Sequence, residues 1–198
     1  GLDAEGRPWL DLRGVRVPLP LRGAHQGANA MLALAVADAA GVPLDRAAAG
    51  MAAMTVPAMR GTWEPYGRAT VINDAYNANP PSMRAALALL AALDPSRQRV
   101  AVLGGMRELG ASAEGLHREV AAAALATSVP LLAGVGELGA ALAQLAPDDP
   151  RVVTGVDVED LWPRLRPRLA PDAIVLLKAS RGVRLERLLP LLAEWAAA

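Results

Sequence analysis

The sequence predicts an α/β protein with a mostly parallel sheet covered by helices on both faces. Short apolar runs alternate with longer helical patterns over residues 62–196, and this alternation is typical of βαβ units with right-handed crossovers. The run Ala173–Leu177 is continuously apolar, as expected of a central strand buried on both faces. A third observation is a polar corner after Thr70–Ile72, followed at once by a helical pattern. Such corners bind ligands in open α/β sheets.

The chain before residue 55 has a different pattern. Residues 7–21 alternate apolar and polar around a glycine, which indicates a hairpin or two short strands. An alanine-rich helix is expected at about Gln26–Ala40, ended by Gly41, and a second helix over Pro43–Met54. These elements look too few to enclose a core of their own. We therefore expect them to be the end of a domain that begins outside this sequence.

The domain boundary is expected within residues 55–61, which contain proline and glycine and show no clear periodicity. The domains would then span residues 1–57 and 58–198. Strands are expected near Thr62–Tyr66, Ala69–Asn73, Arg99–Leu103, Pro130–Gly134, Arg151–Gly155 and Ala173–Lys178. Helices are expected near Pro80–Leu93, Ala113–Thr127, Leu138–Leu145, Val158–Leu169 and Val183–Ala196.

Composition excludes several classes of function. Of 198 residues, 53% are hydrophobic and 20% charged with a net charge of zero, so neither disorder nor an electrostatic grip on nucleic acid or an anionic membrane is expected. The absence of cysteine excludes disulfides and thiolate metal sites. The longest uncharged run, Val120–Gly136, is shorter than the roughly 20 apolar residues of a spanning helix. Since the sequence starts at Gly1 without an initiator Met or a signal-like segment, we expect it to be part of a longer protein. The absence of cysteine fits a cytoplasmic location, and we expect a monomer.

The polar corner is the most informative stretch. The apolar run Thr70–Ile72 ends in polar side chains, and Asn79 is suited to cap the helix that Pro80 opens. An asparagine-rich turn would explain Asn79 by itself. It does not explain three further polar side chains, which we consider candidate ligand-binding groups: Asp74, Tyr76 and Asn77.

The corner resembles a known family. Residues 74–80, Asp-Ala-Tyr-Asn-Ala-Asn-Pro, are similar to the Asp-Ser-Tyr-Asn-Ala-Asn-Pro signature of ATP-dependent Mur ligases of peptidoglycan synthesis, in the branch that adds D-alanyl-D-alanine to UDP-N-acetylmuramoyl-tripeptide. Further segments resemble this family in the same order: residues 23–30, Arg60, residues 102–110 and residues 177–184. The sequence departs from the family pattern at Ala24, Gln26, Met59, Ala75 and Gly105. The family has glycine at the position of Met59, and at that of Gly105 it has a loop aspartate.

The resemblance implies the end of a central ATP-binding domain followed by a Rossmann-like ligase domain. It implies that Asn29 hydrogen-bonds the adenine of ATP through its amide, with His25 in the same segment. Arg60 would meet the ATP phosphates as a hinge arginine, because a guanidinium binds phosphate oxygens in a fork. Asp74 would accept hydrogen bonds from the ribose hydroxyls. Tyr76 and Asn77 would line the nucleotide by stacking and amide hydrogen bonds.

The segment Leu-Lys-Ala-Ser-Arg (177–181) resembles the family's Val-Lys-Gly-Ser-Arg and contains the single lysine of the chain. We expect Lys178, Ser180 and Arg181, together with Asn79, to bind substrate through the carboxylate of the incoming dipeptide or the acceptor peptide. Ser180 and Arg181 would precede a helix whose free N–H groups favour an anion. The alternative is that Lys178 extends to solvent and Arg181 pairs with Glu186 or another neighbour.

Two other polar residues are expected to be structural. Glu108 follows a strand in the segment 102–110, and His117 lies on the flank of the helix beyond it. Since no second ligand is evident near His117, we expect both side chains to be simply solvated.

The family's phosphate-binding loop, Gly-Thr-x-Gly-Lys-Thr, does not occur in the sequence, and its magnesium ligands and modified lysine lie upstream. We therefore expect no catalytic or metal-binding residue here, and no activity of this chain alone, although the intact enzyme would use ATP and Mg²⁺. Two alternatives stay open. One is a sibling Mur ligase or a folylpolyglutamate-type ligase; the other is a non-catalytic nucleotide- or peptide-binding module.

Overall fold

A computed structural model of the chain describes residues 1–3 and 6–198. Over these residues the chain divides into two compact units, Gly1–Pro57 and Ala58–Ala198. No helix within the described residues is both long enough and apolar enough to cross a lipid bilayer.

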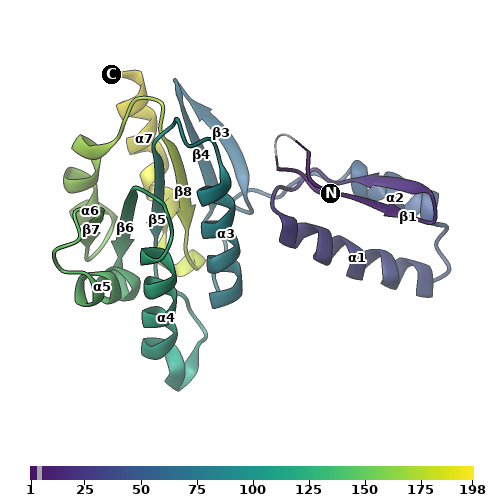
Figure 1. Cartoon of the computed structure of the whole chain (residues 1–198), viewed down its shortest axis with the longest axis horizontal. Helices are drawn as coiled ribbons and strands as arrows, with labels where there is room; N and C mark the ends of the chain where they lie inside the picture. The colour runs from purple at the N-terminus through teal and green to yellow at the C-terminus, as the bar shows by residue number, and fades with distance from the viewer. Residues whose placement is uncertain (4–5) are drawn as a thin grey trace. The chain divides into compact units, whose positions relative to one another are not determined.

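The second unit is built on one sheet with the strand order β3-β4-β8-β5-β6-β7 (Figure 1). The edge strand β3 pairs antiparallel with β4, and all other neighbours in the sheet are parallel. The strands are β3 (Thr62–Tyr66), β4 (Ala69–Asp74), β5 (Arg99–Leu103), β6 (Leu131–Val135), β7 (Val152–Gly155) and β8 (Ile174–Lys178). The helices are α3 (Pro80–Ala92), α4 (Ala113–Leu125), α5 (Gly136–Leu145), α6 (Val158–Leu165) and α7 (Leu188–Ala197). The predicted fold class is confirmed.

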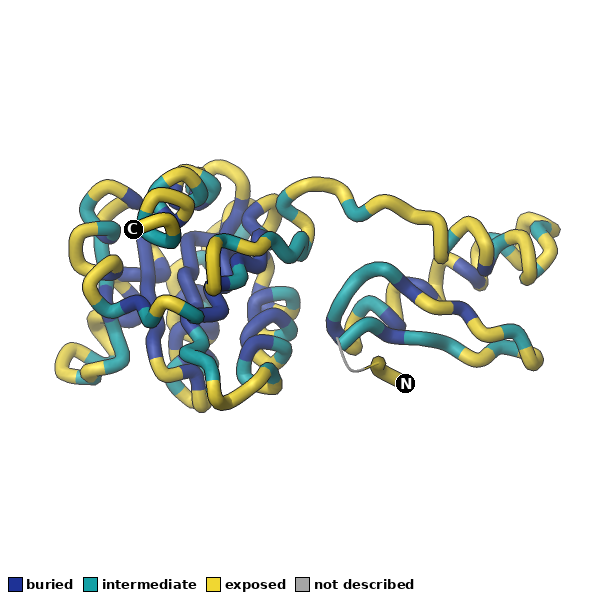
Figure 2. The backbone as a smooth tube through the Cα atoms, turned by 90° about the horizontal axis from the view of Figure 1, so that it is seen from above, coloured by how far each residue is buried: buried dark blue, intermediate teal, exposed yellow. Residues whose placement is uncertain are grey.

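Helices cover both faces of the sheet because consecutive apolar side chains of each strand point to opposite sides. On β4, Val71 belongs to a buried cluster with side chains of α6 and α7, whereas Ile72 belongs to a second cluster with side chains of α3, α4 and α5. Strand β8 follows the same rule and is buried along its whole length, in agreement with its continuously apolar sequence. Figure 2 shows the strands as the buried interior of this unit and the helices as its more exposed surface.

The corner after β4 forms as predicted. Asn79 caps α3: its Oδ1 accepts the backbone N–H of Ser82 at 2.9 Å, and the Oγ of Ser82 accepts the N–H of Asn79 at 3.1 Å. This reciprocal capping box satisfies two donors that the first turn leaves unpaired. Pro80 occupies the first helical position, where a missing N–H costs nothing.

The last predicted helix, Val183–Ala196, is wrong at its start. Two short 3-10 turns, Arg181–Val183 and Leu185–Arg187, precede α7. Between them Arg184 adopts a left-handed conformation with φ of 60°, which a continuous right-handed helix cannot contain. Segment 181–187 is therefore a pair of tight turns rather than the first half of a helix.

The first unit contains a hairpin of β1 (Trp9–Leu12) and β2 (Val15–Pro18) and the helices α1 (Ala24–Ala39) and α2 (Leu44–Ala52). Gly41 ends α1 as predicted: its N–H donates to Asp38 O and that of Val42 donates to Ala37 O, both at 2.9 Å, which is a Schellman motif. The buried side chains form a small cluster, so these elements do enclose a core of modest size: Val17, Leu19, Ala30, Leu34 and Ala48.

Close packing of α5 on the sheet depends on glycine. A Cβ on Gly139 would lie 2.7 Å from the carbonyl oxygen of Gly134 on β6 and 3.3 Å from that of Gly155 on β7. Both contacts are with backbone, which cannot rotate away. Gly115 on α4 has nothing within 4 Å of the corresponding position.

We expect Gly139→Ala to lower the free energy of unfolding by about 1–3 kcal/mol, because α5 must move off the sheet. The matched control Gly115→Ala should raise it by about 0.5–1 kcal/mol, since alanine is the better helix former. Urea denaturation followed by circular dichroism measures both. Equal effects of the two substitutions would contradict the close approach of α5 to β6 and β7.

Candidate functional site

The carboxyl ends of β4 and β8 are joined by an ion pair. Asp74 and Lys178 are register partners in the parallel ladder, and Lys178 Nζ lies 2.7 Å from Asp74 Oδ2. The ammonium also donates to the carbonyl oxygen of Asn77 at 3.0 Å. The Lys178 side chain is 3% exposed and that of Asp74 is 28% exposed. The alternative in which Lys178 extends to solvent is therefore wrong.

Tyr76 brings two arginines to the same corner. The Cζ of Arg60 lies 4.1 Å from the centroid of the Tyr76 ring, and the Cζ of Arg181 lies 5.7 Å from it. Backbone bonds fix this arrangement, because Tyr76 N–H donates to Met59 O and Arg181 N–H donates to Tyr76 O, each at 3.1 Å. Arg60 covers the ring at cation–π distance, so a base could stack on that face only after Arg60 moves.

The two guanidinium groups leave a positive charge at this corner. Arg60, Tyr76 and Arg181 are exposed, and among the described residues neither arginine has a carboxylate partner. The predicted alternative of an Arg181–Glu186 pair is wrong, since the Oε2 of Glu186 is buried without a hydrogen-bond partner in the described part of the chain. Unneutralised guanidinium groups favour an anion such as a phosphate or a carboxylate.

Met59 explains one departure from the family pattern. It has φ of 62°, a left-handed conformation that glycine adopts without strain. The family's glycine at this position thus corresponds to a backbone requirement that methionine meets here at a cost of about 1–2 kcal/mol. The side chain of Met59 packs against the buried core on the α6–α7 face, which offsets part of that cost.

The loops after β5 and β8 are hydrogen-bonded to each other. Gly104 N–H donates to Lys178 O at 2.9 Å, and Ser180 N–H donates to Gly105 O at 3.1 Å. The buried Oγ of Ser180 accepts the N–H of Arg107 at 2.9 Å. Ser180 therefore holds two loops together. Because no long helix begins at Arg181, the helix-dipole argument for an anion at Ser180 and Arg181 does not apply.

Asn77 and Asn79 are exposed on the same corner. The Oδ1 of Asn77 accepts the N–H of Ala78 at 2.8 Å, and the Oδ1 of Asn79 is used by the helix cap. Both amide groups thus have local structural bonds.

His25 and Asn29 lie in the first turns of α1, in the first unit. The Nε2 atoms of Gln26 and His25 are 3.0 Å apart, and Asn29 Nδ2 donates to Gln26 Oε1 at 3.1 Å. Gln26, a departure from the family pattern, therefore connects the two candidate residues. Both His25 and Asn29 are exposed.

His117 is not solvated as expected; it is 3% exposed. Its Nε2 accepts the N–H of Met106 at 2.8 Å, and its Nδ1 lies 2.7 Å from Ala113 O. Acceptance at Nε2 places the proton on Nδ1, so the neutral ring donates to the carbonyl. His117 therefore anchors the loop after β5 to α4. Glu108, by contrast, is exposed as expected.

Sequence reasoning missed Glu137, which supplies a carboxylate to that loop. Its Oε2 lies 2.5 Å from the place where a Cβ on Gly105 would stand, and its Oε1 lies 3.0 Å from Nη1 of Arg107. A carboxylate from the first turn of α5 thus lies beside position 105. Its place directly after β6 could have indicated it by the same rule that selected Asp74.

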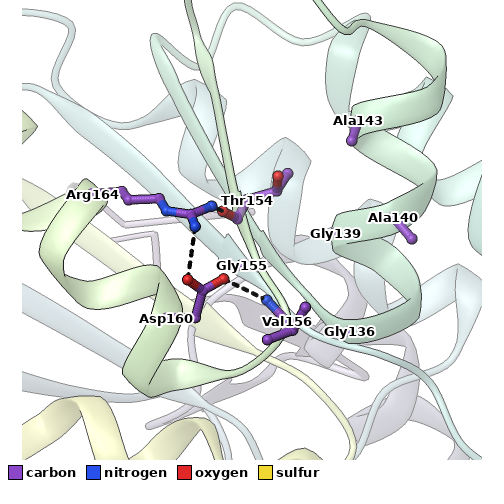
Figure 3. Close-up of a pocket in the computed structure, with 9 residues that line it drawn as sticks. All are labelled: Gly136, Gly139, Ala140, Ala143, Thr154, Gly155, Val156, Asp160 and Arg164. Carbon is purple, nitrogen blue, oxygen red and sulfur yellow. Dashed lines mark hydrogen bonds and ion pairs between the residues drawn. The ribbon is translucent and has the colours of Figure 1, made fainter.

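Two cavities flank α5. One, of about 370 Å³, is lined by residues of α4 and α5 that include His117 and Glu137. The other, of about 330 Å³, lies between α5 and the end of β7 (Figure 3). Neither cavity is lined by Asp74, Tyr76 or Lys178. The candidate site is an exposed corner at the carboxyl edge of the sheet.

The fold and this corner define a class: open α/β domains that bind ligands at the carboxyl ends of parallel strands. Residues 59–181 match the family described as "Mur ligase, glutamate ligase domain". The chain therefore belongs to the Mur ligase family.

Individual relatives agree with this assignment. The chain is 33% identical over 180 residues to the UDP-N-acetylmuramoyl-tripeptide–D-alanyl-D-alanine ligase of Bacillus subtilis, covering 89% of this chain and 39% of the relative. It is 34% identical over 190 residues to the Escherichia coli ligase of the same name, covering 91% and 39%. A crystal structure of MurF from Acinetobacter baumannii matches with a TM-score of 0.82 and 28% identity, over 91% of this chain and 40% of that one. The chain thus spans 39% of the length of these two curated relatives.

Removing Asp74 should destabilise the second unit. Asp74→Ala leaves the Lys178 ammonium without its counter-ion in a buried position, and we expect a loss of about 3 kcal/mol in the free energy of unfolding. The control is Glu119→Ala, which breaks the exposed Arg84–Glu119 pair and should cost less than about 1 kcal/mol. Chemical denaturation measures both. Similar small losses would show that the Asp74–Lys178 pair does not hold β4 to β8.

Proposed function

We propose that this chain is the C-terminal part of an ATP-dependent ligase that adds D-alanyl-D-alanine to UDP-N-acetylmuramoyl-tripeptide in peptidoglycan synthesis. The curated relatives of this name support the proposal, and so does the polar corner at the ends of β4 and β8. The observation that carries it is the pair of unneutralised arginines on Tyr76 beside the Asp74–Lys178 pair. In this proposal, residues 1–57 are the end of the central ATP-binding domain and residues 58–198 are the ligase domain.

The proposed reaction begins with transfer of the γ-phosphoryl group of ATP to the terminal carboxylate of the tripeptide, which gives an acyl phosphate and ADP. The amine of D-alanyl-D-alanine then attacks the acyl carbon, and the tetrahedral intermediate loses a proton and phosphate to form the amide. Residues of this chain bind and orient the reactants, so their contribution is proximity and orientation.

Magnesium would be held outside this chain. The described residues contain no cluster of three or more His, Asp or Glu side chains that could hold a metal ion.

The nucleotide and the dipeptide are assigned to neighbouring parts of the corner. We propose that Arg60 binds the phosphates of ATP, with Asp74 on the ribose and Tyr76 and Asn77 along the nucleotide. Asn29 and His25, in the first unit, are proposed separately, from the family resemblance, as adenine-binding residues. Arg181 would bind the dipeptide carboxylate. Lys178, Ser180 and Asn79 would contribute to that substrate site by fixing the backbone around it, because their polar atoms already form internal hydrogen bonds or ion pairs.

We further propose that the enzyme acts in the cytoplasm as a monomer. Its substrates would be UDP-N-acetylmuramoyl-tripeptide and D-alanyl-D-alanine, with no nucleic acid or membrane partner.

Steady-state kinetics of the whole protein, obtained with the complete reading frame, tests these roles through phosphate release. We expect Arg60→Ala to raise KM for ATP and Arg181→Ala to raise KM for D-alanyl-D-alanine, each by about tenfold or more. Tenfold corresponds to about 1.4 kcal/mol, and hydrogen bonds to charged groups contribute about 1.5–3 kcal/mol. Arg118→Ala on α4, whose guanidinium contacts Gln144, is the control and should change neither constant.

Exchange of the two effects, or no effect of either variant, would overturn the assignments. Turnover with a different amino acid in place of the dipeptide would favour a sibling ligase.

The 198-residue chain alone should show no ATP-dependent ligation, because the phosphate-binding loop is absent from its sequence. Mixing the chain with ATP, UDP-N-acetylmuramoyl-tripeptide and D-alanyl-D-alanine tests this, and any amide product seen by mass spectrometry would contradict it. The whole protein under the same conditions is the positive control.

A further inference from the structure

Strand β7 is an edge of the sheet and pairs with β6 on one side only. An edge strand offers free backbone groups with which another strand can pair. Parallel pairing uses the groups of alternate residues. Leu132 N–H donates to the carbonyl oxygen of Arg151 at 2.8 Å. The backbone N–H and C=O groups of the alternate residues Val152 and Thr154 therefore point away from β6.

Arginine side chains donate hydrogen bonds to the outward carbonyl oxygens. Arg168 Nη1 donates to Val152 O at 3.3 Å, and its Nη2 donates to the carbonyl of Pro150. Arg164 Nη1 donates to Thr154 O at 3.0 Å. Together they cover three successive alternate residues of the edge, 150, 152 and 154.

Arg164 is itself fixed in place, as Figure 3 shows. Its Nη2 lies 2.7 Å from Oδ1 of Asp160, and Oδ2 of Asp160 accepts the N–H of Val156 at 3.0 Å. The outward N–H of Val152 donates to Asp149 O at 2.9 Å. The outward carbonyl groups of this edge thus accept hydrogen bonds from arginines, and the N–H groups of Val152 and Val156 donate to nearby oxygens.

The opposite edge of the sheet is protected differently. β3 carries the exposed Pro65, which has no N–H to donate to a further strand. The most suitable partner strand for β7 is therefore the β7 of a second copy. In a two-fold arrangement each β7 presents the same backbone groups to the other.

We propose that Arg164 and Arg168 keep this chain from pairing edge to edge with a second copy of itself through β7. A guanidinium can be displaced by a strand only if the strand replaces each of its hydrogen bonds and the arginine is rehydrated. The Asp160–Arg164 pair raises the barrier, since displacing Arg164 also releases Asp160. The inference does not depend on the proposed catalytic function.

The test is the association state of the double variant Arg164→Ala/Arg168→Ala of the full chain, measured by sedimentation velocity over rising protein concentration. We expect the unsubstituted chain to keep one mass and the variant to approach twice that mass. The control Arg118→Ala/Arg166→Ala removes the same charge from exposed helical positions without uncovering β7, and it should keep one mass.

A cysteine identifies the surface that pairs, because the chain has none of its own. Thr154→Cys added to the double variant should form an intermolecular disulfide, whereas Ala88→Cys on the exposed side of α3 should not. A folded double variant of constant mass would overturn the proposal, and so would equal association of the control or cross-linking at position 88. If circular dichroism shows the double variant unfolded, the single variants Arg164→Ala and Arg168→Ala are measured instead. Each should associate, though more weakly than a folded double variant would. A constant mass of both single variants would contradict the proposal.

Discussion

The buried ion pair between Lys178 and Asp74 is the constraint on which the candidate site depends. It joins the last residues of two neighbouring parallel strands, at the point where both chains leave the sheet. The Lys178 side chain is buried, so protein groups rather than water molecules bind and orient its ammonium. The second bond of Lys178, to the carbonyl of Asn77, extends the constraint into the polar corner. Backbone bonds from Tyr76 to Met59 and from Arg181 to Tyr76 complete the corner.

The pair also restricts how the corner can serve a ligand. Asp74 already neutralises Lys178, so the net charge of that pair is zero, while Arg60 and Arg181 keep their charges. The attraction for an anion therefore comes from the two arginines on Tyr76. An anion that draws Arg60 away from the ring would also uncover an aromatic face. Phosphate binding and base stacking would then be linked through one side chain.

The sequence was sufficient to predict the fold, because alternating apolar runs and helical patterns determine an α/β sheet and the apolar β8 had to be central. It also predicted the cap at Asn79. It could not predict the break before α7, since the left-handed Arg184 has no signature in residue type. His117 and Glu137 were misjudged or missed because their partners, Met106 N–H and the space beside Gly105, belong to the loop after β5, whose path against α4 and α5 no residue pattern reveals. The ion pair of Lys178 was missed because the register between β4 and β8 is set by tertiary packing, which the sequence does not display.

Arg60 lies close to the boundary between the two units, but the backbone of the second unit fixes it. The carbonyl of Met59 accepts the amide of Tyr76, and Gly61 N–H donates to Asn73 O at 2.9 Å. These bonds on either side make the arginine part of the extended β-ladder. The position of Arg60 is therefore determined by backbone contacts within the second unit, although Arg60 is only the third residue of that unit.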